Sequence, residues 1–175
     1  MSPRSDVVTR TDVHDLVVRF YREVVFDDLL APVFGEVAEV DWARHIPKLI
    51  DYWCRVVLAD PVYDGAILGP HERLNGLTPL RPELFDRWYS LWAAAIDSGW
   101  EGPNARRAKD HAARISAMLS RRLTATEWKV PGGATAPDAH ASQNVARGAD
   151  VGGESACWAH LVDGPEGSFW DVTDV

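Results

Sequence analysis

Apolar residues recur at intervals of three and four in four stretches of residues 1–123, which is the spacing of one face of an α-helix. The first stretch follows Thr11 and Asp12, either of which is a suitable N-cap, and ends at Ala31-Pro32. Its apolar face consists of Val13, Leu16, Val17, Phe20, Tyr21, Val24 and Val25. No stretch alternates with a period of two over a useful length, so the pattern predicts an all-α fold.

Prolines limit the second predicted helix. Its apolar positions are Trp42, Ile46, Leu49, Ile50, Trp53 and Val57. The helix should stop before Asp60-Pro61, because a proline disfavours helical backbone in the residue before it. Pro47 would clash with the carbonyl four residues earlier, which predicts a helix that begins near Ile46 or kinks there. His45 would then lie at the opening corner.

Two more helices are predicted after a turn-rich loop over residues 59–70. Pro82 is a favourable first residue for the third helix, and Gly102-Pro103 separates it from the fourth. The third helix has a broad apolar face made of Leu84, Phe85, Trp88, Leu91, Trp92, Ala95 and Ile96. One side of the fourth helix carries Ala108, Ala112, Ile115, Leu119 and Arg122.

Charge and composition change near Leu123. Residues 124–175 hold eight acidic and two basic side chains, which is -6 of the net charge of -8. Thirteen of the 23 residues from 131 to 153 are Ala, Gly or Pro, which leaves too little apolar surface to offset the entropy of ordering. We therefore expect a globular domain over 1–123, a flexible linker over 124–153 and an acidic tail over 154–175. Apolar residues in the tail suit a short hairpin or a docking peptide.

Charge and hydropathy exclude several classes of protein. A pI near 5.1 argues against a general nucleic-acid partner. The longest apolar runs, such as residues 92–96, are far shorter than the roughly 20 residues of a membrane helix, and the first residues lack an apolar signal core. We therefore expect a cytoplasmic protein with no membrane partner. Cys54 and Cys157 cannot supply a disulfide framework or a four-cysteine zinc site. The eight tryptophans indicate that the fold covers a large apolar area, because such large rings are used for that purpose.

Histidines are the remaining candidate ligands. His14 and His111 lie among charged neighbours, so we expect both on the surface without a role. His160 follows Cys157 in a Cys-x-x-His spacing, but two ligands do not make a metal site. His71 stands after the long loop at a Gly-Pro step, where its imidazole could point from a short helix into an apolar pocket.

An ordered series of residues is more specific than any of these positions. Along the chain it consists of Phe20-Tyr21, residues 28–34, Trp42, His45, Lys48-Leu49, Tyr52-Trp53, Tyr63, Gly65, His71, Phe85, Trp88 and Trp92. In order and spacing this series resembles the third group of the truncated haemoglobin family. The resemblance covers about residues 12–122 and no part of the tail.

The resemblance implies a compact globin in which two helices pack over two others and enclose haem b. His71 matches the proximal histidine that binds iron. Tyr21 and Trp88 match two residues that donate hydrogen bonds to the distal ligand. His45 falls at the distal position of the fourth helix of the globin scheme, and Phe34 matches the phenylalanine that packs on the porphyrin face.

The resemblance also implies the rest of the cofactor pocket. Lys48 would pair with a haem propionate. Leu49, Trp53, Tyr63 and Phe85 would line the pocket beside the residues above, and Trp53 would serve both as core and as a cofactor contact.

Three functions remain open from the sequence. The first is a haem protein that reversibly binds dioxygen, nitric oxide or carbon monoxide. The second is a redox enzyme, a nitric oxide dioxygenase or a peroxidase-like protein, which would need a separate reductase because the chain has no flavin or nicotinamide motif. The third is a cofactor-free helical protein that docks on a partner through its acidic tail.

Overall fold

The computed structural model describes residues 4–61, 63 and 65–132. Its helical segments are α1 (Arg10–Val24), the short π-helix η1 (Val33–Val37), α2 (Trp42–Leu58), α3 (Leu68–Leu77), α4 (Pro82–Gly99) and α5 (Pro103–Thr124). No strand occurs within these residues, so the all-α prediction is confirmed. No helix in the described part of the chain has the length and hydropathy needed to cross a lipid bilayer.

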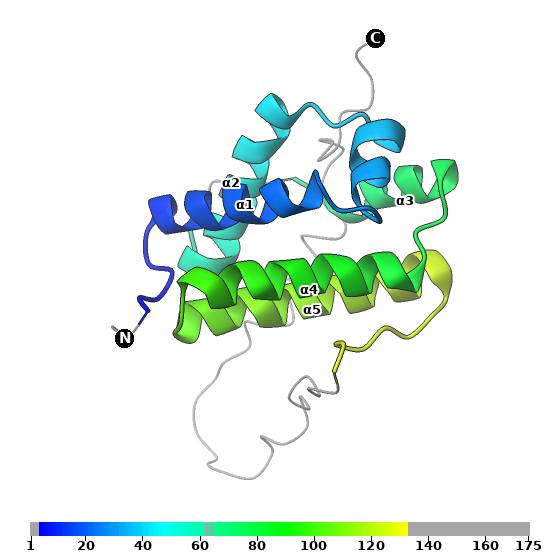
Figure 1. Cartoon of the computed structure of the whole chain (residues 1–175). Helices are drawn as coiled ribbons and strands as arrows, with labels where there is room; N and C mark the ends of the chain where they lie inside the picture. The colour runs from blue at the N-terminus through cyan, green and yellow to red at the C-terminus, as the bar shows by residue number, and fades with distance from the viewer. Residues whose placement is uncertain (1–3, 62, 64, 133–175) are drawn as a thin grey trace.

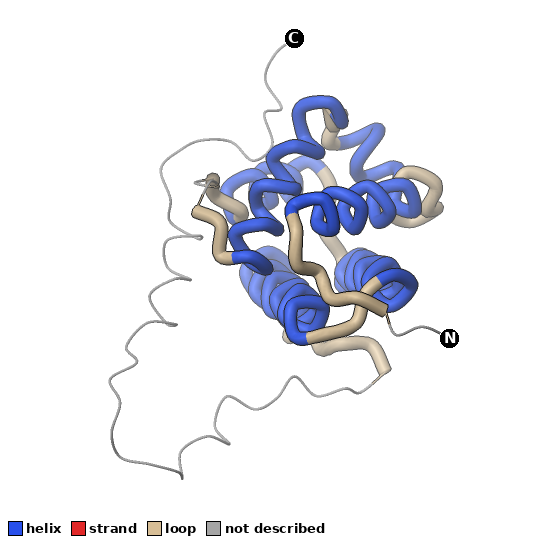
Figure 2. Tube along the Cα trace, turned by 90° about the vertical axis from the view of Figure 1, so that its left-hand side faces the viewer, coloured by secondary structure: helices blue, strands red, loops and turns tan. Residues whose placement is uncertain are grey.

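Four of the helices form two pairs, one packed over the other (Figures 1 and 2). α4 and α5 run side by side, and α1 contacts α2. The pairs meet where α1 contacts α4 and where α2 contacts α5. The main helix contact of α3 is with α5. The predicted two-over-two sandwich is confirmed.

The predicted apolar faces meet at the centre of this sandwich. Phe20 of α1 and Trp92 of α4 are fully buried, and their rings meet edge to face with centroids 5.1 Å apart. Ala108 and Ala112 of α5 are buried, and their small side chains let α5 pack closely against the neighbouring helices. The Trp92 indole N–H donates to the Ala108 carbonyl at 3.3 Å, so the largest core side chain is also satisfied as a donor.

Capping moves the limits of α1 away from the predicted ones. The helix begins at Arg10 because Thr9 is the N-cap: its hydroxyl accepts from the Asp12 backbone N–H, and the Asp12 carboxylate accepts from the Thr9 backbone N–H. The prediction of Thr11 or Asp12 as the cap is therefore wrong. The helix ends at Val24 rather than at residues 31–32, and the Asp27 carboxylate then accepts two backbone N–H groups in a separate turn.

Pro47 lies inside α2, so the prediction that the helix begins near Ile46 is wrong. α2 begins at Trp42, where the Asp41 carboxylate accepts from the backbone N–H groups of Ala43 and Arg44. A proline removes the donor that would bond the carbonyl of residue 43, and that residue is exposed to solvent. The cap therefore holds a first turn that the proline leaves incomplete.

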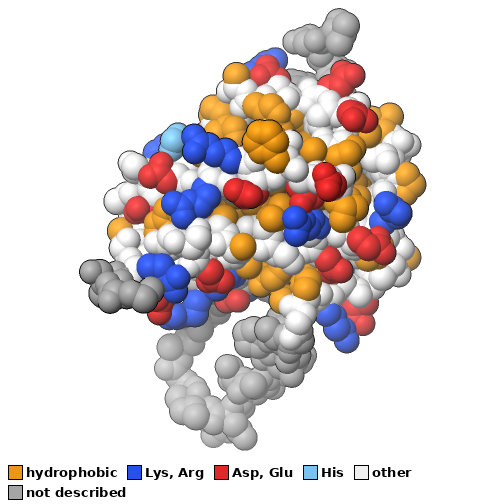
Figure 3. All heavy atoms as spheres, viewed as in Figure 1, with side chains coloured by type: hydrophobic (Ala, Val, Ile, Leu, Met, Phe, Trp, Pro, Cys, Tyr) orange, Lys and Arg blue, Asp and Glu red, His pale blue; other side chains and the backbone are white. Residues whose placement is uncertain are grey.

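The chain after α5, described to residue 132, contacts the body through Trp128. Trp128 is buried there, its indole N–H donates to the Asp86 carboxylate at 2.6 Å, and its ring meets Tyr89 edge to face. The rest of the expected linker and the acidic tail, with the Cys157 and His160 pair, lie outside the described residues. On the face shown in Figure 3, acidic and basic side chains are interspersed, which fits a body that carries little of the net charge.

Candidate functional site

A cavity of about 810 Å³, counting the part that opens to solvent, lies between the two helix pairs and α3. The lining consists of Tyr21, Leu30, Val33, Phe34, Leu49, Tyr52, Trp53, Ile67, His71, Leu74, Leu80, Leu84, Phe85, Trp88, Ile115 and Leu119. The described residues that line the cavity include no acid, lysine or arginine. The cavity therefore suits a largely apolar ligand.

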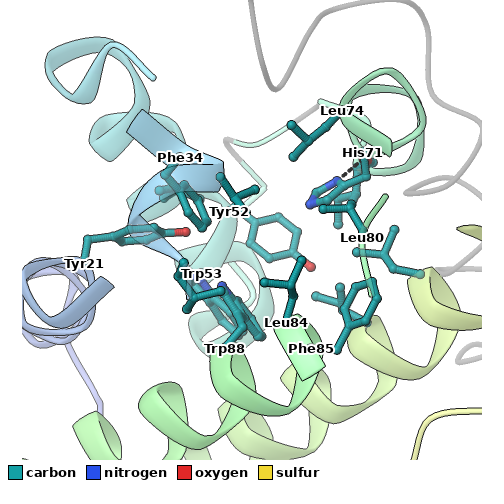
Figure 4. Close-up of a pocket in the computed structure, with 16 residues that line it drawn as sticks. Tyr21, Phe34, Tyr52, Trp53, His71, Leu74, Leu80, Leu84, Phe85 and Trp88 are labelled. Atoms are coloured by element: carbon teal, nitrogen blue, oxygen red, sulfur yellow. Dashed lines mark hydrogen bonds between the residues drawn. The ribbon is translucent and has the colours of Figure 1, made fainter. Parts of the chain in front are cut away.

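His71 enters the cavity from the first turns of α3 (Figure 4). Its Nδ1 lies 2.7 Å from the carbonyl oxygen of Ile67, one turn earlier, and donates to it. Burial lowers the pKa of His71 below its usual value, although the bond to Ile67 acts in the opposite direction. The imidazole is therefore neutral at physiological pH, and with the proton on Nδ1 its Nε2 presents a lone pair.

Tyr21 lies at the opposite end of the cavity and comes from α1. In Figure 4 its hydroxyl and the His71 imidazole point toward each other across the cavity. Burial raises the pKa of the Tyr21 phenol, while the Trp88 indole N–H, which donates to the hydroxyl, lowers it. Tyr21 is thus a neutral phenol beside a second donor from α4.

Tryptophans from α2 and α4 form one wall of the cavity. Trp53 stacks on Trp92 with ring centroids 4.1 Å apart and planes 23° apart. The ring of Trp92 is in turn nearly parallel to that of Trp88, with centroids 6.1 Å apart and planes 7° apart. Trp53 and Trp88 face the cavity while Trp92 lies behind them, so a rigid aromatic wall supports both side chains.

Comparison with known proteins gives a consistent result. No family model matches the chain. A curated Group 3 truncated hemoglobin of Campylobacter jejuni is 24% identical over 95 residues, which cover 53% of this chain and 72% of that protein. The crystal structure of a group III truncated hemoglobin from Campylobacter jejuni superimposes with a TM-score of 0.59 at 21% identity, covering 69% of this chain and 94% of that one. The chain folds as a truncated globin.

Most of the predicted site residues lie around one cavity. Tyr21, His71 and Trp88 supply its polar groups, as described above. The apolar residues that were predicted and do line it are Phe34, Leu49, Trp53 and Phe85. Side chains 50 residues apart along the chain, on α1 and α3, therefore meet at one site.

Three residues of the predicted set do not line the cavity. His45 is buried on α2, where its ring meets Tyr21 and Trp42 at centroid distances of 6.1 Å. Lys48 is half-buried on the same helix. Tyr63 is buried and packs edge to face on the ring of Tyr52 at 5.2 Å. His45 and Tyr63 therefore each pack against a residue that lines the cavity.

His111 was predicted to be exposed, and this is wrong. It is 4% exposed, and its Nε2 is hydrogen-bonded to the Tyr52 hydroxyl. Burial lowers the pKa of His111 to about 3. His111 lies three residues after Ala108 and four before Ile115, so it shares the buried face of α5. Burial separates its Nε2 from water, and the Tyr52 phenol replaces water as the hydrogen-bond partner.

Sequence reasoning also missed part of the lining. Tyr52 was placed in the diagnostic series but given no site role, although it precedes Trp53 on α2. Leu80, Leu84 and Ile115 line the cavity as well. Helical spacing predicts the last two as core positions, but it does not separate a core that faces a cavity from one that faces another side chain.

Proposed function

We propose that this truncated globin binds haem b and, through it, reversibly binds dioxygen or another diatomic ligand. The observation that carries the proposal is the placement of His71 and Tyr21 at opposite ends of one apolar cavity. A neutral imidazole on one side and a neutral hydrogen-bond donor on the other are what a haem with one open axial position requires. The relatives are named as truncated hemoglobins, which supports the same function.

The cavity residues fit a haem. Flat aromatic rings and aliphatic side chains from six helical segments line it, which suits a large planar tetrapyrrole. The lone pair on His71 Nε2 would hold the iron, and the Ile67 carbonyl fixes the tautomer that presents it. Haem would supply an iron that binds a diatomic ligand reversibly. Lys48, next to the cavity residue Leu49, would pair with a propionate.

Tyr21 and Trp88 would act on the distal ligand. Dioxygen takes on partial negative charge in a haem protein, so it gains more from hydrogen-bond donors than carbon monoxide does. Each donor contributes about 1–3 kcal/mol, which is roughly five- to a hundredfold in affinity. His45 packs against Tyr21, so we assign it the positioning of that phenol rather than direct ligand contact.

Haem titration of the purified full-length chain tests the proposal. We expect uptake of one haem per chain and a ferrous carbon monoxide spectrum typical of imidazole ligation. In His71→Gly the Soret band should shift or weaken, and added free imidazole should restore it. His14→Gly is the matched control, because His14 is exposed on α1.

Two results would overturn the proposal. A chain that takes up no haem would leave a cofactor-free helical protein as the better interpretation. A spectrum that is the same in His71→Gly and in the unsubstituted chain would reject the axial assignment even if haem binds.

A further inference from the structure

Tyr52 and His111 form a buried polar pair for which the proposed function has no use. Tyr52 comes from α2 and lines the cavity, and His111 comes from α5 behind it. The phenol oxygen is hydrogen-bonded to the imidazole Nε2, and the exposed fractions of the two residues are 3% and 4%. Besides the polar groups of Tyr21, His71 and Trp88, the cavity wall therefore contains a phenol that is hydrogen-bonded to an imidazole behind it.

The charge states of the pair are set by burial. Burial raises the pKa of the Tyr52 phenol well above 10, and the nearby Tyr63 raises it further. Burial lowers the pKa of His111 to about 3. At neutral pH the phenol keeps its proton and the imidazole is neutral, so the phenol O–H can donate to a lone pair on Nε2.

Tyr21 is the natural comparison, because it is the second tyrosine on the cavity. The group hydrogen-bonded to its hydroxyl is the Trp88 indole, which donates and has no lone pair to accept a proton. Tyr52 instead meets an imidazole, which can take the phenolic proton without movement of heavy atoms. Oxidation of a phenol makes it a strong acid, so this difference decides which tyrosine is suited to lose an electron.

Aromatic rings connect Tyr52 to the rest of the cavity wall. Its ring centroid lies 5.4 Å from that of Trp53. Trp53 stacks on Trp92, which is nearly parallel to Trp88. An electron can therefore pass between Tyr52 and a group in the cavity directly or through neighbouring rings.

We propose that Tyr52 is a redox-active residue that gives one electron to an oxidant in the cavity and its phenolic proton to His111. The O–H bond of Tyr52 breaks, an N–H bond forms at Nε2, and a neutral phenoxyl radical faces an imidazolium. The electron reduces the oxidant by one equivalent. An external one-electron reductant restores the phenol as the imidazolium returns the proton. The oxidising equivalents come from a hydroperoxide that reacts with the bound cofactor, so this route rests on the proposed function.

Freeze-quench electron paramagnetic resonance tests the proposal on the full-length haem-loaded chain mixed with equimolar hydrogen peroxide. We expect a tyrosyl signal that narrows when ring-deuterated tyrosine is incorporated, which separates it from a tryptophan radical. The signal should be lost in Tyr52→Phe and kept in Tyr89→Phe, because Tyr89 packs on Trp128 outside the cavity. A signal that is unchanged in Tyr52→Phe overturns the proposal.

Two further variants separate chemistry from folding. If Tyr52→Phe does not fold, 3-fluorotyrosine at position 52 keeps the hydroxyl and should add a fluorine splitting to the signal; absence of the splitting overturns the assignment. In His111→Gln the amide can accept a hydrogen bond but not a proton, so radical formation should slow roughly a hundredfold and lose its solvent deuterium effect. An unchanged rate and isotope effect would reject His111 as the proton acceptor.

Photo-oxidation of the haem-free chain distinguishes this proposal from the proposed function; here light and a cobalt(III) electron acceptor convert ruthenium(II) tris-bipyridine into the ruthenium(III) oxidant. A chain that takes up no haem but forms the Tyr52 radical in light would defeat the proposed function and support the redox pair. A chain that binds haem through His71 but forms no Tyr52 radical by either route would retain the first proposal and overturn the second.

Discussion

His71 and His111 are both imidazoles whose pKa is lowered by burial, yet they are suited to different chemistry. His71 donates a hydrogen bond from Nδ1 to the carbonyl of Ile67, the N-cap residue of α3, and its other nitrogen is directed into the cavity. His111 has its Nε2 engaged by Tyr52 on another helix and lies behind the cavity wall. The partner of each ring, rather than its burial, decides whether it can ligate a metal or accept a proton.

The largest expected effect separates the two imidazoles by haem affinity. His71→Gln should weaken haem binding by more than about a hundredfold, because the metal ligand itself is removed. His111→Gln should change it by no more than about tenfold, since that ring lies outside the cavity lining. Titration of each variant with haemin, followed in the Soret region, measures both. Equal losses would remove the distinction between the two rings.

Tyr21→Phe should have the next largest effect, on ligand release. Loss of one donor costs about 1–3 kcal/mol, so dioxygen should dissociate roughly five to a hundred times faster. Carbon monoxide should respond much less, because it carries little charge. Stopped-flow dissociation rates for both ligands, with Tyr89→Phe as control, test this. Equal acceleration for both gases would indicate a steric effect instead.

The stability of the chain should depend on His111. His111→Phe leaves the buried Tyr52 hydroxyl without this hydrogen bond, which should lower the free energy of unfolding by about 1–3 kcal/mol. The double variant with Tyr52→Phe should lose less than the sum of the two single variants. Urea unfolding of the haem-free chains measures the cycle. Additive losses would mean that the pair contributes no coupling energy.

The low pKa of His111 also predicts a pH effect with a definite sign. An unfolded histidine binds a proton below about pH 6.5, whereas folded His111 does not until about pH 3, so acid favours the unfolded chain. Stability should fall by about 1–1.5 kcal/mol between roughly pH 7.5 and 5.5 from this group alone. Urea midpoints across that range should depend less on pH in His111→Gln. An identical pH dependence in the variant would reject the assignment.

His14 should show the smallest effect and sets the baseline for the comparison. Its side chain is exposed on α1 beside Asp15. His14→Ala should change the free energy of unfolding by about 0.5 kcal/mol or less and leave haem uptake unchanged. Thermal unfolding and haem titration check this. A larger change would show that an exposed histidine can still contribute to stability or haem uptake in this protein.

Sequence reasoning succeeded where one helical face carried the information. The spacing of Phe20, Tyr21 and Val24 placed them on the buried face of α1, as the structure has them. It was less successful at helix ends, because the cap at Thr9 depends on a reciprocal bond with Asp12 that composition does not reveal. Pro47 shows the same limit, since a cap at Asp41 outweighed the break that a proline predicts.

By itself, the periodicity of the sequence determined four of the helices and their apolar faces, because these follow from spacing within single segments. The aromatic set around His71 came from the resemblance to the third group of truncated haemoglobins. Only the tertiary structure decided which residues line the cavity and which lie one layer behind it. His45 contacts Tyr21 rather than the cavity, and His111 meets Tyr52 from 59 residues away. Contacts between helices depend on how their faces cross, and the periodicity of one helix carries no record of the side chain that the next helix presents to it.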